Sequence, residues 1–161
     1  MAIFVGTHVN KVDSKGRVSV PAEFRALLGE PATFFAFPSF MHRGIECVND
    51  TFMSSLSEDV GDLDLFSDEQ DNLSDLIFAS SHTLSIDGDG RIVLPEILRL
   101  HAKLDGQSAF VGKGKTFQIW KPSEHNEFQR HARERARADR LVLRKHPQGP
   151  GSNSDPLENG T

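Results

Sequence analysis

The chain carries one short pattern twice, 74 residues apart: DSKGRVSVPAEFR begins at Asp13, and DGDGRIVLPEILR begins at Asp87. Five of the thirteen aligned positions are identical, and three more keep an apolar residue in both copies. Self-similarity at a fixed offset indicates an internal duplication. The chain should therefore fold as two copies of one supersecondary unit.

Each copy predicts a tight turn between two short strands. THVNKVD (7–13) and SHTLSID (81–87) alternate apolar and polar residues, which is the period of a strand. The Asp that follows can accept hydrogen bonds from the turn backbone, and the Gly three positions later can take a positive φ. Pro21 and Pro95 then end the next strand and favour the start of a helix, each closed by Gly. We expect a hairpin, a short helix and further strands in each half, which makes the fold class α+β.

Charge is distributed unevenly along the 161 residues, although the net charge is only −5. Eight acidic residues crowd the middle, and an arginine-rich run precedes a tail of Pro, Gly, Ser and Asn. Such a tail buries too little apolar surface to fold. The expected divisions are a first repeat (1–56), an acidic helical connector (57–80), a second repeat (81–124), a basic C-terminal helix (125–145) and a disordered tail (146–161).

Composition also narrows the class of protein. The single cysteine, Cys47, rules out an intrachain disulfide framework and C-x-x-C zinc sites. No apolar run approaches the roughly 20 residues that cross a bilayer, and the N-terminus lacks the pattern of a secretory signal. We expect a cytoplasmic protein that does not act at a membrane.

Catalytic and metal-binding interpretations of the repeated motif meet specific objections. Paired aspartates could share a proton, as in aspartic proteases, but an arginine directly after the turn would keep them ionised. SIDGDGRIVLPE, from Ser85, resembles a calcium loop, yet the first copy has Lys15 and Ala22 in place of its acids. GKGK (112–115) lacks the remaining residues of a phosphate loop and predicts a hairpin turn. The sequence predicts no enzyme, no cofactor and no metal site.

Arginine is what both copies retain directly after the turn. Arg17 and Arg91 should project from the two hairpin tips, where a guanidinium can grip phosphate or read the edge of guanine. Lys15 adds a cation to the first tip, whereas Asp89 makes the second tip less basic. Affinity for DNA grows with the number of phosphates neutralised, so many copies of such a tip are needed. The predicted DNA-binding residues are Arg17, Arg91 and Lys15, and Asp13, Gly16, Asp87 and Gly90 are predicted to shape the loops.

The two copies, the opening FVGTHVNKVDSKGR and the later TFQIWKP closely resemble the MraZ family, a double-repeat member of the AbrB/SpoVT-like fold. The resemblance spans roughly residues 1–145. It implies a swapped-hairpin β-barrel, assembly into closed homo-oligomeric rings, and binding of double-stranded DNA at short tandem promoter repeats.

The function that the resemblance implies is repression of the division and cell-wall gene cluster by a nucleoid-associated protein. The resemblance places the DNA contacts on Arg17 and Arg91. Arg25 and Arg99 could support the loops, but an internal ion pair is the expected role. The alternative function is a non-catalytic assembly module whose loops bind a protein or an anionic ligand.

Overall fold

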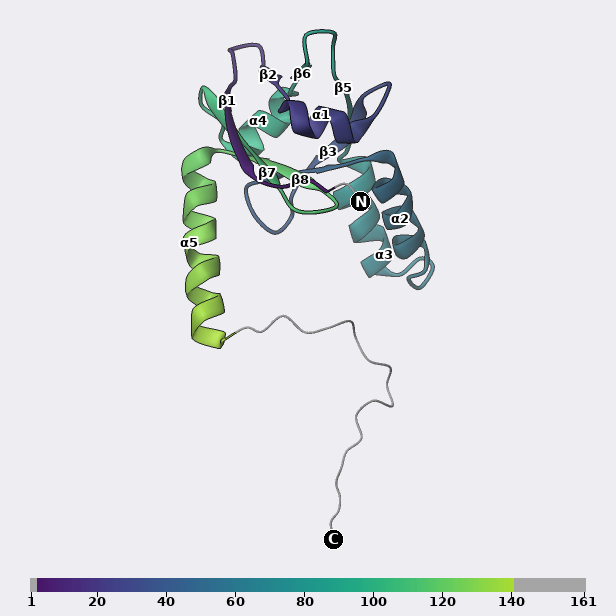
Figure 1. Cartoon of the computed structure of the whole chain (residues 1–161). Helices are drawn as coiled ribbons and strands as arrows, with labels where there is room; N and C mark the ends of the chain where they lie inside the picture. Colours follow the sequence, from purple (N-terminus) through teal and green to yellow (C-terminus); the bar gives the residue numbers. More distant parts are fainter. Residues whose placement is uncertain (1–2, 141–161) are drawn as a thin grey trace. The chain divides into compact units, whose positions relative to one another are not determined.

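Helices and antiparallel strands alternate along the chain, which divides into two compact units, 1–128 and 129–161. The computed structural model describes residues 3–140 (Figure 1). The expected tail (146–161) and the last residues of the expected C-terminal helix (141–145) lie outside the described residues.

The two sequence copies form the same series of elements. The first is β1 (Thr7–Lys11), β2 (Arg17–Ser19), α1 (Ala22–Leu28), β3 (Thr33–Pro38) and β4 (Ile45–Val48). The second is β5 (His82–Ser85), β6 (Arg91–Val93), α4 (Glu96–Ala102), β7 (Gln107–Gly112) and β8 (Phe117–Trp120). Between them lie α2 (Asp50–Gly61), α3 (Asp68–Ser74) and the π-helical turn η1 (Asp75–Ala79), and α5 (Pro122–Asp139) comes last. The α+β class predicted from the sequence is confirmed.

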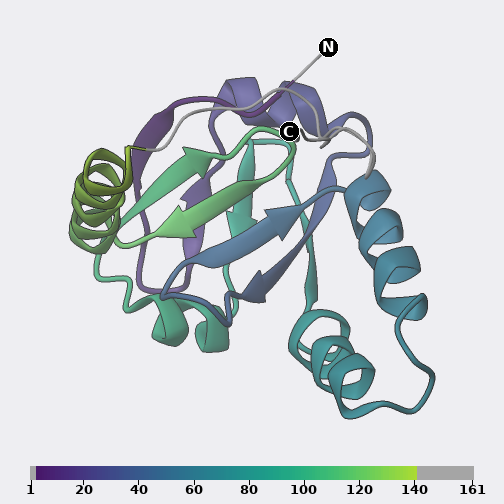
Figure 2. The same cartoon turned by 90° about the horizontal axis from the view of Figure 1, so that it is seen from below.

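Strands are exchanged between the two repeats. The main sheet is antiparallel with the order β1-β7-β8-β4-β3-β5, so β1 pairs with β7 and β5 pairs with β3 (Figure 2). At its centre β4 pairs with β8, with Ile45 opposite Ile119. β2 and β6 form a separate two-stranded sheet, called here the β2–β6 ribbon. In the part of the chain described, β1 and β5 are the unpaired edges of the main sheet, so its pairing alone does not close a barrel.

Proline sets the boundary between each ribbon strand and the helix that follows. Pro21 and Pro95 have extended backbone angles, with ψ of 139° and 147°, and α1 and α4 begin at the next residue. Each prolyl carbonyl accepts hydrogen bonds from the third and fourth residues that follow it. The prediction that proline ends the strand and starts the helix is confirmed. Gly29 ends α1 as expected, but Lys103 in the left-handed conformation ends α4.

The apolar core lies between the helices of the repeats and the main sheet. Phe24 of α1 and Leu98 of α4, which are equivalent positions of the two copies, are both fully buried. Phe24 and Phe117 each contact Phe4, with ring centroids 5.0–5.2 Å apart. Cys47 is also buried in this core, and burial raises the pKa of its thiol. The core therefore fixes α1 and α4 by the same face of each helix.

A second apolar cluster fixes the connector against the sheet. Phe37 of β3 and Val48 of β4 pack with Val60 of α2 and Ile77 of η1. The expected acidic connector (57–80) contains the end of α2, then α3 and η1, and α2 itself begins earlier, at Asp50. All eight acidic side chains are exposed: Glu58, Asp59, Asp62, Asp64, Asp68, Glu69, Asp71 and Asp75.

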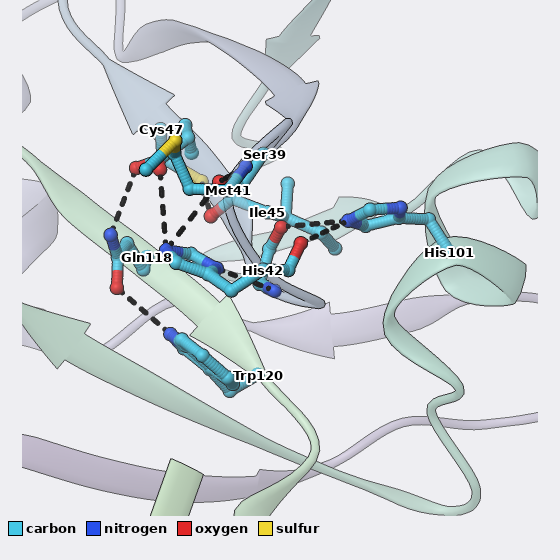
Figure 3. A network of polar contacts seen from close by, with 10 residues as sticks. Ser39, Met41, His42, Ile45, Cys47, His101, Gln118 and Trp120 are labelled. Carbon is cyan, nitrogen blue, oxygen red and sulfur yellow. Dashed lines mark hydrogen bonds and ion pairs between the residues drawn. The ribbon is translucent and has the colours of Figure 1, made fainter. Parts of the chain in front are cut away.

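A polar network ties α4 to the loop between β3 and β4 (Figure 3). His101 Nε2 lies 3.1 Å from the carbonyl oxygens of both His42 and Gly44. On the sheet, Trp120 Nε1 donates to Gln118 Oε1 at 2.8 Å, and Gln118 Nε2 donates to Glu46 Oε1 at 2.9 Å. The two His101 contacts hold the end of α4 that follows Arg99.

Candidate nucleic-acid interface

The first turn is organised by the carboxylate of Asp13. Its Oδ1 accepts hydrogen bonds from the backbone N–H groups of Lys15 and Arg17, both at 2.9 Å. Gly16 donates to the Asp13 carbonyl at 3.0 Å and has a φ of +90°. The backbone N–H of Arg17, followed by its side chain, lowers the pKa of Asp13 to about 2. The turn thus holds a carboxylate that is ionised at neutral pH behind the Arg17 side chain.

The second turn repeats this geometry. Asp87 Oδ1 accepts from the backbone N–H groups of Asp89 and Arg91 at 2.9 Å, and Gly90 has a φ of +80°. The hydrogen bond from the Arg91 backbone is the main cause that lowers the pKa of Asp87. Asp87 and Gly90 thus have the same hydrogen bonds and backbone conformation in the second turn as Asp13 and Gly16 have in the first.

The hairpins that carry these turns are shorter than expected. Asp13 N donates to the Arg17 carbonyl and Asp87 N to the Arg91 carbonyl, which closes each turn. Beyond the first turn, the backbone pairing of β1 with β2 is limited to the isolated bridge between Val12 and Val18, and Asn10 Nδ2 donates to the Ser19 carbonyl at 2.7 Å. β2 pairs instead with β6 of the other repeat. A strand's residue pattern is the same for either partner, so the pattern alone could not predict this exchange.

Pairing of β2 with β6 brings the two predicted arginines onto one surface. Arg17 lies opposite Val93, and Ser19 lies opposite Arg91. Val18 and Ile92 point inward and are buried, so the alternating residues point outward. Arg17 and Arg91 are therefore diagonal neighbours on the outward face of the β2–β6 ribbon, whose flanking loops project side by side in Figure 1.

The two arginines are held differently. Arg17 Nε donates to Asp13 Oδ2 at 2.7 Å, and about half of its side chain is exposed. Within residues 3–140 its terminal Nη atoms have no hydrogen-bond partner, so they remain available to a ligand. Arg91 Nη2 contacts Asp89 Oδ2 at 3.3 Å, and its Nε is buried without a partner among the described residues. Asp13 orients Arg17, whereas Asp89 competes for Arg91.

A groove of about 320 Å³ joins the two arginines. Asp13, Arg17 and Arg91 line it together with Lys11 of β1. Sequence reasoning did not select Lys11, although a basic residue on the strand before the motif was a usable signal. Lys15 is exposed at the tip of the first turn. The structure thus brings together Arg17, Arg91 and Lys11, with Lys15 beyond them.

Arg25 and Arg99 do not form the internal ion pair that was expected. Arg25 Nη1 donates to the Val20 carbonyl at 2.6 Å, and Arg99 Nε donates to the Leu94 carbonyl at 3.0 Å. No carboxylate lies within ion-pair distance of either guanidinium in the described part of the chain. Backbone carbonyls at the ends of β2 and β6 provide acceptors without any acidic residue, which explains the correction.

The described residues offer neither a metal centre nor a membrane span. No three His, Cys, Asp or Glu side chains in the described range are grouped to hold a metal ion. No described helix is long and apolar enough to span a bilayer. The β2–β6 ribbon, with Arg17 and Arg91 on one face and a shared groove, is the candidate site.

Comparison with known proteins gives the family. Residues 77–145 match the sequence model of a family described as "MraZ protein, putative antitoxin-like". A relative from Rickettsia akari is 39% identical over 146 residues, which are 89% of this chain and 98% of the relative. One from Gluconacetobacter diazotrophicus is 39% identical over 155 residues (92% and 98%), and one from Gluconobacter oxydans is 42% identical over 143 residues (85% and 87%). All three are named transcriptional regulator MraZ. The chain therefore belongs to the MraZ family.

Proposed function

We propose that this protein regulates transcription by binding double-stranded DNA through Arg17 and Arg91, with Lys15 as an added contact at the first tip. The observation that carries the proposal is the β2–β6 register, which puts both arginines on one outward face. The major groove of B-DNA admits a two-stranded β-ribbon, and a guanidinium there can bind guanine O6 and N7 together. The site has no catalytic role in this proposal.

The proposed targets are short tandem repeats in the promoter of the division and cell-wall gene cluster, where binding represses transcription. One ribbon supplies few cations, so a single contact is weak, and linked contacts on successive repeats supply avidity. The proposed assembly is a closed homo-oligomeric ring of swapped-hairpin barrels that acts at the nucleoid in the cytoplasm. Ile97 and Leu100, which are 61% and 69% exposed on α4, offer apolar surface for such an assembly.

A fluorescence anisotropy titration with a repeat-containing promoter fragment tests the proposal. Arg17→Ala and Arg91→Ala should each weaken binding by at least about tenfold, since each removes a charge-assisted contact worth roughly 1.5–3 kcal/mol. Arg43→Ala is the matched control, because Arg43 is exposed on the β3–β4 loop and lies outside the ribbon. Light scattering should find the same oligomer for all four proteins.

The dependence of affinity on salt separates DNA binding from other roles. The wild-type affinity should fall steeply with added salt, as counterions leave the phosphates, and the slope should be shallower for Arg17→Ala. Equal affinities of the wild type and both ribbon variants would contradict the proposal. In that case the ribbon would serve the alternative function, in which it binds a protein or an anionic ligand.

A further inference from the structure

We propose that Arg25 and Arg99 are crossed positioning residues: each lies on the helix of one repeat and braces the turn of the other repeat. The two DNA-facing turns are then held as one unit rather than as two independent loops. This inference rests on the proposed function for its effect on DNA binding. The brace itself can be tested without DNA.

Arg25 of α1 lies at the junction between its own ribbon strand and the second turn. Its Nη1 donates to the Val20 carbonyl at 2.6 Å, and Val20 N donates to the Gly90 carbonyl at 2.9 Å. The guanidinium also occupies the space beside Gly90. A Cβ at Gly90 would lie 2.6 Å from Nη1 and 2.9 Å from Cζ of Arg25. The first repeat therefore packs against the second turn.

Arg99 of α4 makes the reciprocal contact. Its Nε donates to the Leu94 carbonyl at 3.0 Å, and its Nη1 reaches the Ser14 carbonyl of the first turn at 3.4 Å. Leu94 N donates to the Gly16 carbonyl at 2.8 Å, and a Cβ at Gly16 would lie 2.8 Å from Arg99 Nε. One guanidinium thus bridges carbonyls of both repeats.

The chemistry of arginine suits this position. Its planar fork of donors can hold two carbonyls at fixed angles, whereas a lysine ammonium acts as a single point on a flexible stem. Arg17 and Arg91 each directly follow a braced glycine. Movement of the brace would therefore move the side chains that we propose to contact DNA.

Hydrogen exchange measured by mass spectrometry tests the crossing in the free protein. Arg99→Ala should raise exchange in residues 14–20 of the first repeat more than in 88–91 of its own turn. Arg25→Ala should do the reverse and raise exchange most in 88–94. Arg43→Ala, the control for loss of a cation, should change neither segment. Exchange that rises only in the turn of the repeat that carries the substitution, or equally in both turns, would contradict the proposal that each arginine holds the turn of the other repeat.

Double variants measure the contact directly, because the two glycines have different neighbours. Arg25 side-chain atoms are the three nearest to a Cβ at Gly90, whereas the backbone oxygen of Leu94 lies 2.5 Å from a Cβ at Gly16. Arg25→Ala should therefore relieve part of the damage caused by Gly90→Ala, read as the urea midpoint. Arg99→Ala should relieve much less of the damage caused by Gly16→Ala. Strict additivity in the first pair would contradict the contact.

The effect on DNA separates positioning from charge. Arg99→Ala should weaken binding to the promoter fragment by about tenfold, the usual loss when one hydrogen-bonded partner is removed, without changing the salt slope. Arg99→Lys keeps the charge but not the fork, so it should restore little of the affinity. Full rescue by lysine would show an electrostatic role and overturn positioning. If the wild type bound no DNA, the proposed function would fail while the exchange measurements still tested the brace.

Discussion

Arg17 of β2 lies directly opposite Val93 of β6, and both side chains are on the outward face of the ribbon. Val93 is 57% exposed, although it is apolar and sits beside a charged group. The equivalent residue of the first repeat is Ser19. The ribbon therefore presents two arginines with one apolar and one hydroxyl neighbour, which makes the duplicated surface asymmetric.

Val93→Ser should change base preference more than overall affinity. An exposed apolar side chain in the major groove can contact the methyl group of thymine, which a hydroxyl replaces poorly. We expect the wild type to lose affinity, by about threefold to tenfold, when the repeats carry deoxyuridine in place of thymidine. Val93→Ser should bind the two fragments equally. Anisotropy titrations of both proteins on both fragments give the four affinities needed. An equal loss of affinity on the deoxyuridine fragment for both proteins would exclude the methyl contact.

Asp89→Lys should strengthen DNA binding. Asp89 occupies the position of Lys15 in the first turn, and its carboxylate lies 3.3 Å from Arg91 Nη2. Its replacement by lysine frees Arg91 and adds a cation at the second tip. Each added phosphate contact steepens the salt dependence by about one unit, so the gain should be largest at low salt. Asp64→Lys, an equal charge change on the connector, is the control. A gain as large in the control would show that only net charge matters.

Local chemistry made much of each repeat predictable. Asp13 and Gly16 are spaced for a turn whose backbone bonds to the carboxylate, and Pro21 has no N–H to continue a strand. These rules act within a few residues, so the turns, the ribbon strands and α1 and α4 could be predicted separately. The equivalence of Arg17 and Arg91 followed from the repeat.

The partners of these elements could not be predicted in the same way. Alternation fixes which face of β1 or β2 is buried, but it is identical whether the partner strand is near in sequence or distant. Exchange of strands places Arg99 beside the Ser14 carbonyl, 85 residues away. An ion pair was expected from the helix positions of Arg25 and Arg99, and the carbonyl acceptors that they bind instead cannot be recognised in a sequence. The ribbon face and the crossed contacts therefore required the structure.

Asp13→Asn should separate turn formation from the orientation of Arg17. The amide oxygen can still accept from the backbone of Lys15 and Arg17, but the amide nitrogen cannot accept from Arg17 Nε. We expect a folded protein whose DNA affinity falls by about threefold to tenfold. Anisotropy with the promoter fragment measures the loss. Unchanged affinity would show that Arg17 needs no support from Asp13.

Asp13→Asn should also make the free energy of unfolding less dependent on pH in acidic solution. Folding lowers the pKa of Asp13 from 3.8 to about 2, chiefly because the Arg17 backbone N–H binds the carboxylate. Since the folded state holds this proton less tightly, the stabilisation is complete above pH 3.8 and is lost as pH falls through about 2. Urea midpoints between pH 5 and pH 2 should fall less for Asp13→Asn than for the wild type. Asp64→Asn is the control, and an equal flattening there would contradict the assignment.

His42 should make the fold less stable in mildly acidic solution. Its Nδ1 accepts from Gly44 N at 2.9 Å, so the proton of the neutral ring is on Nε2, which faces Glu46 Oε2 and Ser39 Oγ at 3.5 Å. Burial, partly as a result of stacking on Trp120, lowers the pKa of His42 from 6.5, while Glu46 opposes the shift. The unfolded chain therefore binds the proton more tightly than the folded one.

The sign of the pH dependence follows from this difference. Stability is complete above pH 6.5 and declines as pH falls toward the lower pKa of the folded state. His42→Phe keeps the stacked ring but leaves Gly44 N–H without its acceptor, which should cost about 1 kcal/mol near pH 8. Because phenylalanine does not titrate, the gap between the variant and the wild type should shrink from pH 7 to pH 5. Urea midpoints across this range measure it, with His131→Gln on the exposed part of α5 as the control. A constant gap would show that His42 binds its proton equally well in the folded and unfolded states, which would contradict the lowered pKa.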